Sequence, residues 1–159
     1  MKKDKFHNTN AVRMLDKAGA VFESIELGFD EAKTGTEVAE ILGVSSDIVY
    51  KTLVTVGKSG EHYVFMVPVE EKLDLKKSAK IVNEKFVEPI KQKDLLSLTG
   101  YVHGGCSPIG MKKYFRTVIY KNAYKYENIY FSAGRIGQQI KMSVSELEKM
   151  IPLENGDII

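Results

Sequence analysis

Short runs of apolar residues separated by turn-forming residues dominate the chain, a pattern typical of β-strands. The β-branched run at 52–56 and the apolar run at 63–69 flank Gly57-Lys58-Ser59-Gly60, a sequence favoured in hairpin turns. We therefore predict a central hairpin. Shorter strands are predicted in five further segments: 21–27, 86–90, 117–120, 128–132 and 138–142.

Apolar residues at helical spacing follow a capping residue in four other segments. The first helix is expected to begin after Asn8 or Thr9 and to end at Gly19, where glycine readily adopts the left-handed cap. The second is expected after Thr34, which with Glu37 has the spacing of a capping box.

The third helix is predicted over 75–82 after Asp74, and a helical turn at 94–98 follows it. Ser143 and Glu146 repeat the capping-box spacing ahead of a last helix, which Pro152 ends. No repeat or linker interrupts this order. We therefore predict a single α+β domain over residues 1–159, with a mixed, mostly antiparallel β-sheet and surrounding helices.

The composition is that of a globular protein, with 159 residues of which 43% are hydrophobic and 28% charged. No apolar run is long enough to span a bilayer, and the charged start of the chain lacks the apolar core of a secretion signal. We therefore predict a cytoplasmic protein. The formal net charge is only +2, so binding of nucleic acid would require a local basic patch.

The most constrained stretch is segment 98–110, which gathers Gly104, Gly105 and Gly110 around Pro108. Adjacent glycines leave backbone N–H groups accessible, so such a loop can receive a phosphate, a carboxylate or a developing oxyanion. A glycine-rich connection between strands is the simpler alternative on composition alone.

Segment 99–113 resembles the Gly-Gly-x-Ser-Pro-x-Gly signature of the YbaK/EbsC family of prolyl-tRNA editing proteins, which are aminoacyl-tRNA deacylases. Segments 49–54, 73–80 and 129–135 agree with the same family in the same order. The resemblance implies the editing-domain fold and removal of a mischarged amino acid, in the first place cysteine on tRNA(Pro). It also implies the acceptor end of mischarged tRNA as partner, with prolyl-tRNA synthetase as a candidate partner, and no cofactor.

The resemblance also assigns roles to individual residues. Lys51 and Gly104 correspond to the catalytic positions: the lysine holds the aminoacylated 3′ end and stabilises negative charge, and the glycine leaves room for the substrate. The substrate-binding positions are Thr52, Gly105, Ser107, Ser132 and Gln139. At Gln139 the family has an acidic residue, so no carboxylate role is carried over. The family's N-terminal aromatic residue is not assigned to Phe29.

Four basic residues flank the loop and the segment around Ser132, and we predict that they contact tRNA phosphates: Lys112, Lys113, Arg116 and Arg135. Basic residues that only keep the surface soluble are the alternative.

Other chemistries find less support. Cys106 and His103 resemble a nucleophilic pair, but such pairs form through the fold and we expect a structural cysteine. With His7 and His62, these residues give one close pair, whereas a zinc site needs three or four ligands. A phosphate loop fails because Met111 and Lys112 replace its Lys and Ser/Thr, and no serine has a nucleophile-elbow context. A non-catalytic module that binds aminoacyl-tRNA or a synthetase remains the alternative function.

Overall fold

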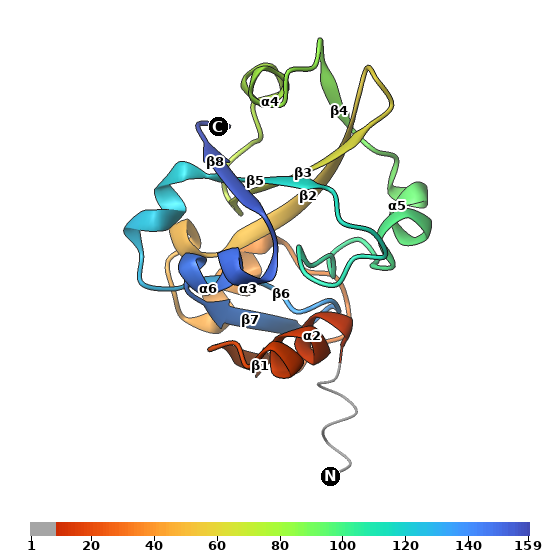
Figure 1. The fold of residues 1–159 in the computed structure, drawn as a ribbon. Coiled ribbons are helices and arrows are strands. Elements are labelled where there is room, and N and C mark those ends of the chain that lie inside the picture. Colours follow the sequence, from red (N-terminus) through yellow and green to blue (C-terminus); the bar gives the residue numbers. More distant parts are fainter. Residues whose placement is uncertain (1–8) are drawn as a thin grey trace.

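The computed structural model describes residues 9–159, so the candidate cap Asn8, His7 and the charged start of the chain lie outside the described residues. The strands of the described part form two sheets (Figure 1). One has five strands in the order β4-β2-β3-β5-β8, and the other has three in the order β1-β7-β6. The sequence predicted one sheet, and the structure divides its strands between two.

The predicted central hairpin is confirmed as β2 (Tyr50–Gly57) and β3 (His62–Pro68), which pair antiparallel along their length. β4 (Val87–Pro89) pairs antiparallel with the outer edge of β2. On the other side β5 (Arg116–Tyr120) runs parallel to β3, and β8 (Leu153–Gly156) runs parallel to β5. β8 was not predicted, because Glu154 and Asn155 interrupt its apolar pattern.

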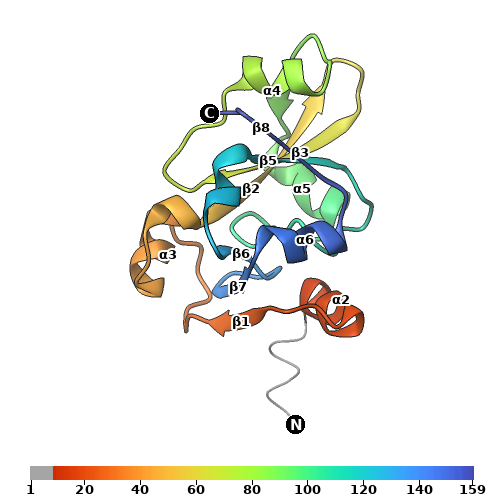
Figure 2. The ribbon, with the colours of Figure 1, turned by 60° about the vertical axis from the view of Figure 1, so that its left-hand side comes forward.

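The smaller sheet consists of β1 (Glu23–Glu26), β7 (Gln138–Met142) and β6 (Ile129–Ser132), all antiparallel. A single bridge between Val49 and Tyr130 connects it to the start of β2. The two sheets also share one core, in which Met66 and Ile119 of the larger sheet pack with Phe131 and Ile140 of the smaller. Figure 2 shows the smaller sheet at the opposite end of the molecule from β4. Burial of both inner faces in one core stabilises this arrangement.

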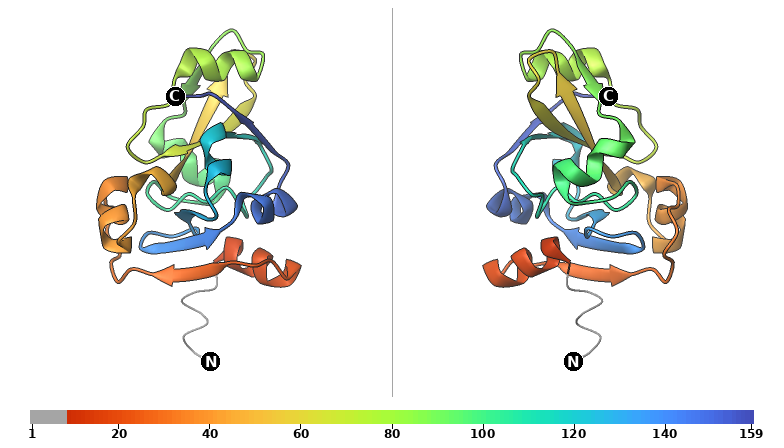
Figure 3. Two further views of the ribbon diagram at one scale, coloured as in Figure 1. Left: turned by 90° about the vertical axis from the view of Figure 1, so that its left-hand side faces the viewer. Right: turned by 90° about the vertical axis from the view of Figure 1, so that its right-hand side faces the viewer.

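The predicted helices are confirmed and lie around the sheets (Figure 3). α2 (Asn10–Ala18) begins at the N-cap Thr9, and α3 (Gly35–Leu42) begins at Thr34 with a complete capping box. α4 (Leu75–Ile81) begins at Asp74. α5 (Gln92–Thr99) is longer than the predicted turn, and short 3-10 helices occupy Ser46–Ile48 and Lys121–Lys125.

α6 (Val144–Met150) differs from its prediction at the cap. The Ser143 hydroxyl accepts from the backbone N–H of Glu146, as predicted. The Glu146 carboxylate, however, accepts from the backbone N–H of Val21, at 2.9 Å, and from Lys149. Glu146 therefore ties α6 to the segment before β1 and does not complete a capping box. No helix of residues 9–159 is long and apolar enough to cross a membrane.

Candidate functional site

A cavity of about 260 Å³ lies where the start of β2 meets the end of β6, and we call it the small cavity. Five predicted site residues line it: Lys51, Thr52, Gly104, Ser132 and Gln139. They come from β2, from segment 98–110, which we call the glycine loop, and from β6 and β7. Ser132 and Gln139 are direct cross-strand partners. The fold thus brings residues from distant parts of the sequence to one hollow.

Lys51 is half-buried and forms no ion pair within residues 9–159. Burial lowers the pKa of its ammonium, and the nearby carboxylate of Glu71 partly offsets that effect. Because the cation is partly desolvated and not neutralised, it can interact strongly with an anionic group that enters the cavity.

Thr52 and Gln139 each carry a buried polar atom without a partner in the described structure, the hydroxyl of Thr52 and Oε1 of Gln139. An unpaired buried acceptor destabilises a protein by about 1–3 kcal/mol. Both residues line the small cavity, so these atoms are available to a polar group that enters it. Tyr50 also lines the cavity, and its hydroxyl has no hydrogen-bond partner among residues 9–159. Burial raises the pKa of that phenol.

The glycine loop adopts a conformation that explains Gly104 differently from its sequence prediction. Gly104 has φ +86°, a left-handed backbone that favours glycine. A Cβ at this position would lie 3.3 Å from Cβ of Ala32 and 3.6 Å from Cγ1 of Ile136. A side chain would therefore strain the backbone and press on the wall of the cavity.

Gly105 and Ser107 do not line the small cavity, so the geometry gives no support to their predicted contact with substrate. A Cβ on Gly105 would lie 3.0 Å from the backbone of Arg135, and its own N–H donates to the carbonyl of Val102. Ser107 is fully buried, and its hydroxyl accepts from the N–H of Ile109. Both residues hold the loop in shape.

Cys106 and His103 both line the small cavity. Burial raises the pKa of the Cys106 thiol to about 12, against a smaller opposing effect of a hydrogen bond with Thr99. A thiol with that pKa stays protonated at neutral pH, and only the thiolate is a strong nucleophile. His62 lies away from the cavity and packs its ring against Phe115.

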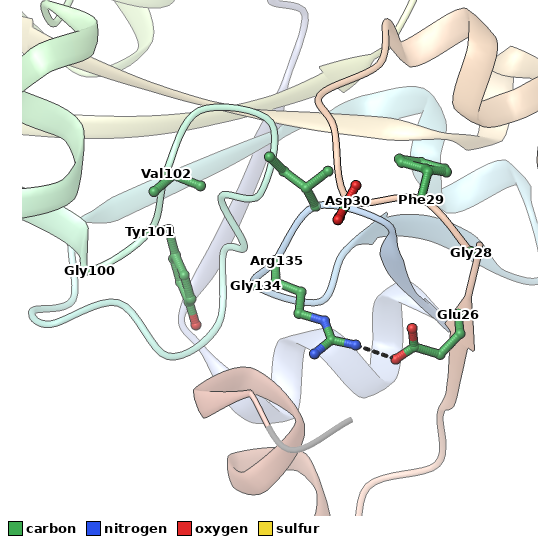
Figure 4. Close-up of a pocket in the computed structure, with 10 residues that line it drawn as sticks. Glu26, Gly28, Phe29, Asp30, Gly100, Tyr101, Val102, Gly134 and Arg135 are labelled. Carbon is green, nitrogen blue, oxygen red and sulfur yellow. Dashed lines mark hydrogen bonds and ion pairs between the residues drawn. The ribbon is translucent and has the colours of Figure 1, made fainter. Parts of the chain in front are cut away.

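The segment 33–35, at the start of α3, also belongs to the site and was not predicted from the sequence. Lys33, Thr34 and Gly35 line the small cavity, and Nζ of Lys33 lies 5.2 Å from the centre of the Phe29 ring. This segment has no periodic pattern to reveal it. Phe29 itself lines a neighbouring cavity with Arg135 (Figure 4).

The four predicted tRNA-binding residues lie outside the small cavity. Arg116 donates to both carboxylate oxygens of Glu154, at 2.6 and 2.9 Å, and Arg135 pairs with Glu26 at 2.6 Å. Lys112 donates to a backbone carbonyl of α5, and Lys113 lines a separate hollow. The two arginines are thus already partly neutralised.

Comparison with known proteins agrees with the fold and shows the family. The family model described as the aminoacyl-tRNA editing domain matches residues 30–150. The chain is 42% identical over 156 residues to EbsC of Enterococcus faecalis, an inferred Cys-tRNA(Pro)/Cys-tRNA(Cys) deacylase. The match covers 98% of this chain and 93% of EbsC.

Two crystal structures share the fold. An inferred trans-editing enzyme for prolyl tRNA synthetase matches with a TM-score of 0.83 and 23% identity, covering 95% of this chain and 97% of that one. The hypothetical protein APE2540 matches with a TM-score of 0.87 and 21% identity, covering 94% and 99%. Since the family match spans the segments that form the small cavity, the predicted relationship is confirmed: the chain belongs to the aminoacyl-tRNA editing domain family.

Proposed function

We propose that the protein is a free-standing deacylase that removes a mischarged amino acid from tRNA, with cysteine on tRNA(Pro) as its substrate. The observation that carries this proposal is the convergence of Lys51, Ser132 and Gln139 on one small cavity. The name of EbsC supports the choice of substrate. We place the activity in one domain over residues 1–159 and in the cytoplasm, with prolyl-tRNA synthetase as a candidate partner.

The small cavity suits the aminoacyl group. At about 260 Å³ it lies just below the usual range of small-molecule sites, so it favours a compact side chain such as that of cysteine. In this proposal the unpaired Oε1 of Gln139 accepts a hydrogen bond from the α-ammonium group of the substrate. A neutral amide holds that cation less strongly than a carboxylate would. The size and shape of the small cavity then decide which amino acid side chain is accepted.

Lys51 stabilises the negative charge that develops on the ester oxygen. The N–H of Gly105 is occupied within the loop, so Lys51 is the better placed donor. The thiol of the substrate supplies the nucleophile: sulfur attacks its own carbonyl carbon and the bond to the ribose oxygen breaks. The thiol proton ends on that oxygen, and water then opens the thiolactone. Direct attack of water on the ester is the competing route.

Release of labelled amino acid from Cys-tRNA(Pro) tests the proposal. We expect multiple turnovers, and slower release of serine from the same tRNA because a hydroxyl is a weaker nucleophile than a thiol. Equal rates for the two amino acids would rule out participation of the substrate thiol. Binding of both tRNAs without release above the buffer rate would contradict the deacylase and favour a binding module.

A further inference from the structure

A second cavity, of about 650 Å³, lies beside the small one, and we call it the large cavity. Three segments line both. The segment before α3 contributes Phe29 and Asp30 to the large cavity and Lys33 to the small one. Likewise, segment 100–102 of the glycine loop and the turn 134–136 line the large cavity, while His103, Gly104, Cys106 and Ser132 line the small one.

The wall between the two cavities is thin. The Cβ position of Gly104, which lines the small cavity, lies 3.6 Å from Cγ1 of Ile136, which lines the large one. Residues that line the two cavities therefore lie in contact across the wall. A molecule whose reacting group lies in the small cavity can therefore place a neighbouring group in the large cavity.

The charges of the large cavity do not suit a phosphate. Nη2 of Arg135 is held by Oε2 of Glu26 at 2.6 Å (Figure 4). Asp30 is exposed and makes no hydrogen bond or ion pair within residues 9–159. With Nζ of Lys33 over the Phe29 ring, two carboxylates face two cations, so no surplus positive charge selects an anion. The carboxylate of Asp30 favours a group with N–H donors.

The remaining surface of the large cavity is apolar. Val102 is 45% exposed although it is β-branched and apolar, and it faces the hollow from the glycine loop. Figure 4 shows Tyr101 and Val102 on one side and Phe29 and Glu26 on the other, with Arg135 between them. A flat ring with donors and acceptors on its edge matches this combination of apolar walls and charged groups.

We propose that the large cavity binds the adenine base of the 3′-terminal nucleotide of tRNA, with Asp30 accepting from its exocyclic amino group. Arg135 donates to a ring nitrogen of the base, and Val102 and Phe29 contact its faces. The ester and the terminal base are attached to one ribose, which matches two adjacent cavities. This inference rests on the proposed function, since it places the ester in the small cavity.

The test removes the amino group from the substrate and the carboxylate from the protein. Cysteine-charged minihelices carry adenosine or purine riboside, which lacks the 6-amino group, at the 3′ end. A third minihelix lacks the 4-amino group of the penultimate cytidine. Wild type, Asp30→Ala and Glu31→Ala are compared, because Glu31 has the same charge on the same exposed segment but lines neither cavity.

We expect purine riboside to lower kcat/KM of wild type about tenfold and to have no further effect on Asp30→Ala, the non-additivity expected for two groups in contact. Glu31→Ala should behave like wild type. Equal rates of wild type on the adenosine and purine substrates, or discrimination only at the penultimate cytidine, would overturn the inference.

Binding of uncharged minihelices, measured in parallel, separates this inference from the proposed function. If wild type does not deacylate but binds the adenosine minihelix more tightly than the purine one, through Asp30, the cavity assignment stands and the deacylase proposal fails. If it neither deacylates nor discriminates in binding, both fail.

Discussion

Two adjacent glutamines of β7 show how single residues divide between fold and function. Gln138 is fully buried, and its Nε2 donates to the hydroxyl of Ser24 at 2.7 Å. Gln139 points to the other face of the strand, lines the small cavity and has an unpaired Oε1. The first amide stabilises the sheet, and the second is available to a ligand.

This difference predicts opposite effects of the same substitution. Gln139→Leu removes an unpaired buried acceptor, so the free energy of unfolding in urea should stay equal to that of wild type or rise by up to about 3 kcal/mol, while deacylation falls at least about tenfold. Gln138→Leu breaks a buried hydrogen bond and should lower stability by about 1–3 kcal/mol. Normal activity of folded Gln139→Leu would remove this residue from the substrate site.

Cys106 gives a second prediction at the scale of the residue. Its thiol pKa is raised to about 12 by burial, so below pH 9 almost no thiolate exists. Alkylation by iodoacetamide should therefore be slow at pH 8, and Cys106→Ala should keep most of its activity. Loss of turnover in folded Cys106→Ala, with rapid alkylation of wild type, would restore the cysteine as nucleophile.

At the scale of elements, local signals found the helices and the hairpin, while long-range pairing was missed. Thr34 forms its full capping box because both partners are local. Glu146 has an equally good local partner but bonds Val21 instead, and no local pattern reveals that choice. β8 depends on parallel pairing with β5 across a long connection, and the Val49–Tyr130 bridge likewise joins distant segments.

The pairing of β5 with β8 allows a test of Arg116, which was predicted to contact tRNA. Glu154 of β8 lies opposite Val118 of β5, and both of its carboxylate oxygens accept hydrogen bonds from Arg116. Because both side chains are over 40% exposed, Arg116→Gln should lower stability by less than about 1 kcal/mol. We expect its KM for Cys-tRNA(Pro) to stay unchanged; a severalfold rise in KM would support the tRNA contact.

The carboxyl group of Glu154 makes the free energy of unfolding depend on pH. Its hydrogen bonds with Arg116 lower the carboxyl pKa in the folded state. The stabilisation is therefore present above the ordinary pKa of glutamate and is lost as pH falls through the lowered value. The difference in unfolding free energy between wild type and Arg116→Gln should shrink over that range. A difference that persists in acid would show that packing, not the ion pair, is responsible.

At the scale of the whole molecule, motif resemblance singled out residues that the fold brings together, and it missed what depends on proximity alone. Lys51, Gly104 and Ser132 stand in recognisable segments, and the fold brings them to one cavity. Lys33 and most residues of the large cavity lie in loops and turns, where the sequence has no periodic pattern. Only the folded arrangement therefore reveals them. Gly105 and Ser107 share the motif but serve the shape of the loop.

We propose that deacylation of tRNA takes place in the small cavity and depends on the positive charge of Lys51. Single-turnover release of cysteine from Cys-tRNA(Pro) by wild type, Lys51→Ala and Lys58→Ala tests it directly, because Lys58 is an exposed lysine in the hairpin turn. We expect Lys51→Ala to lose about 100-fold in rate with unchanged stability, and Lys58→Ala to match wild type. Equal rates for wild type and folded Lys51→Ala would contradict the account.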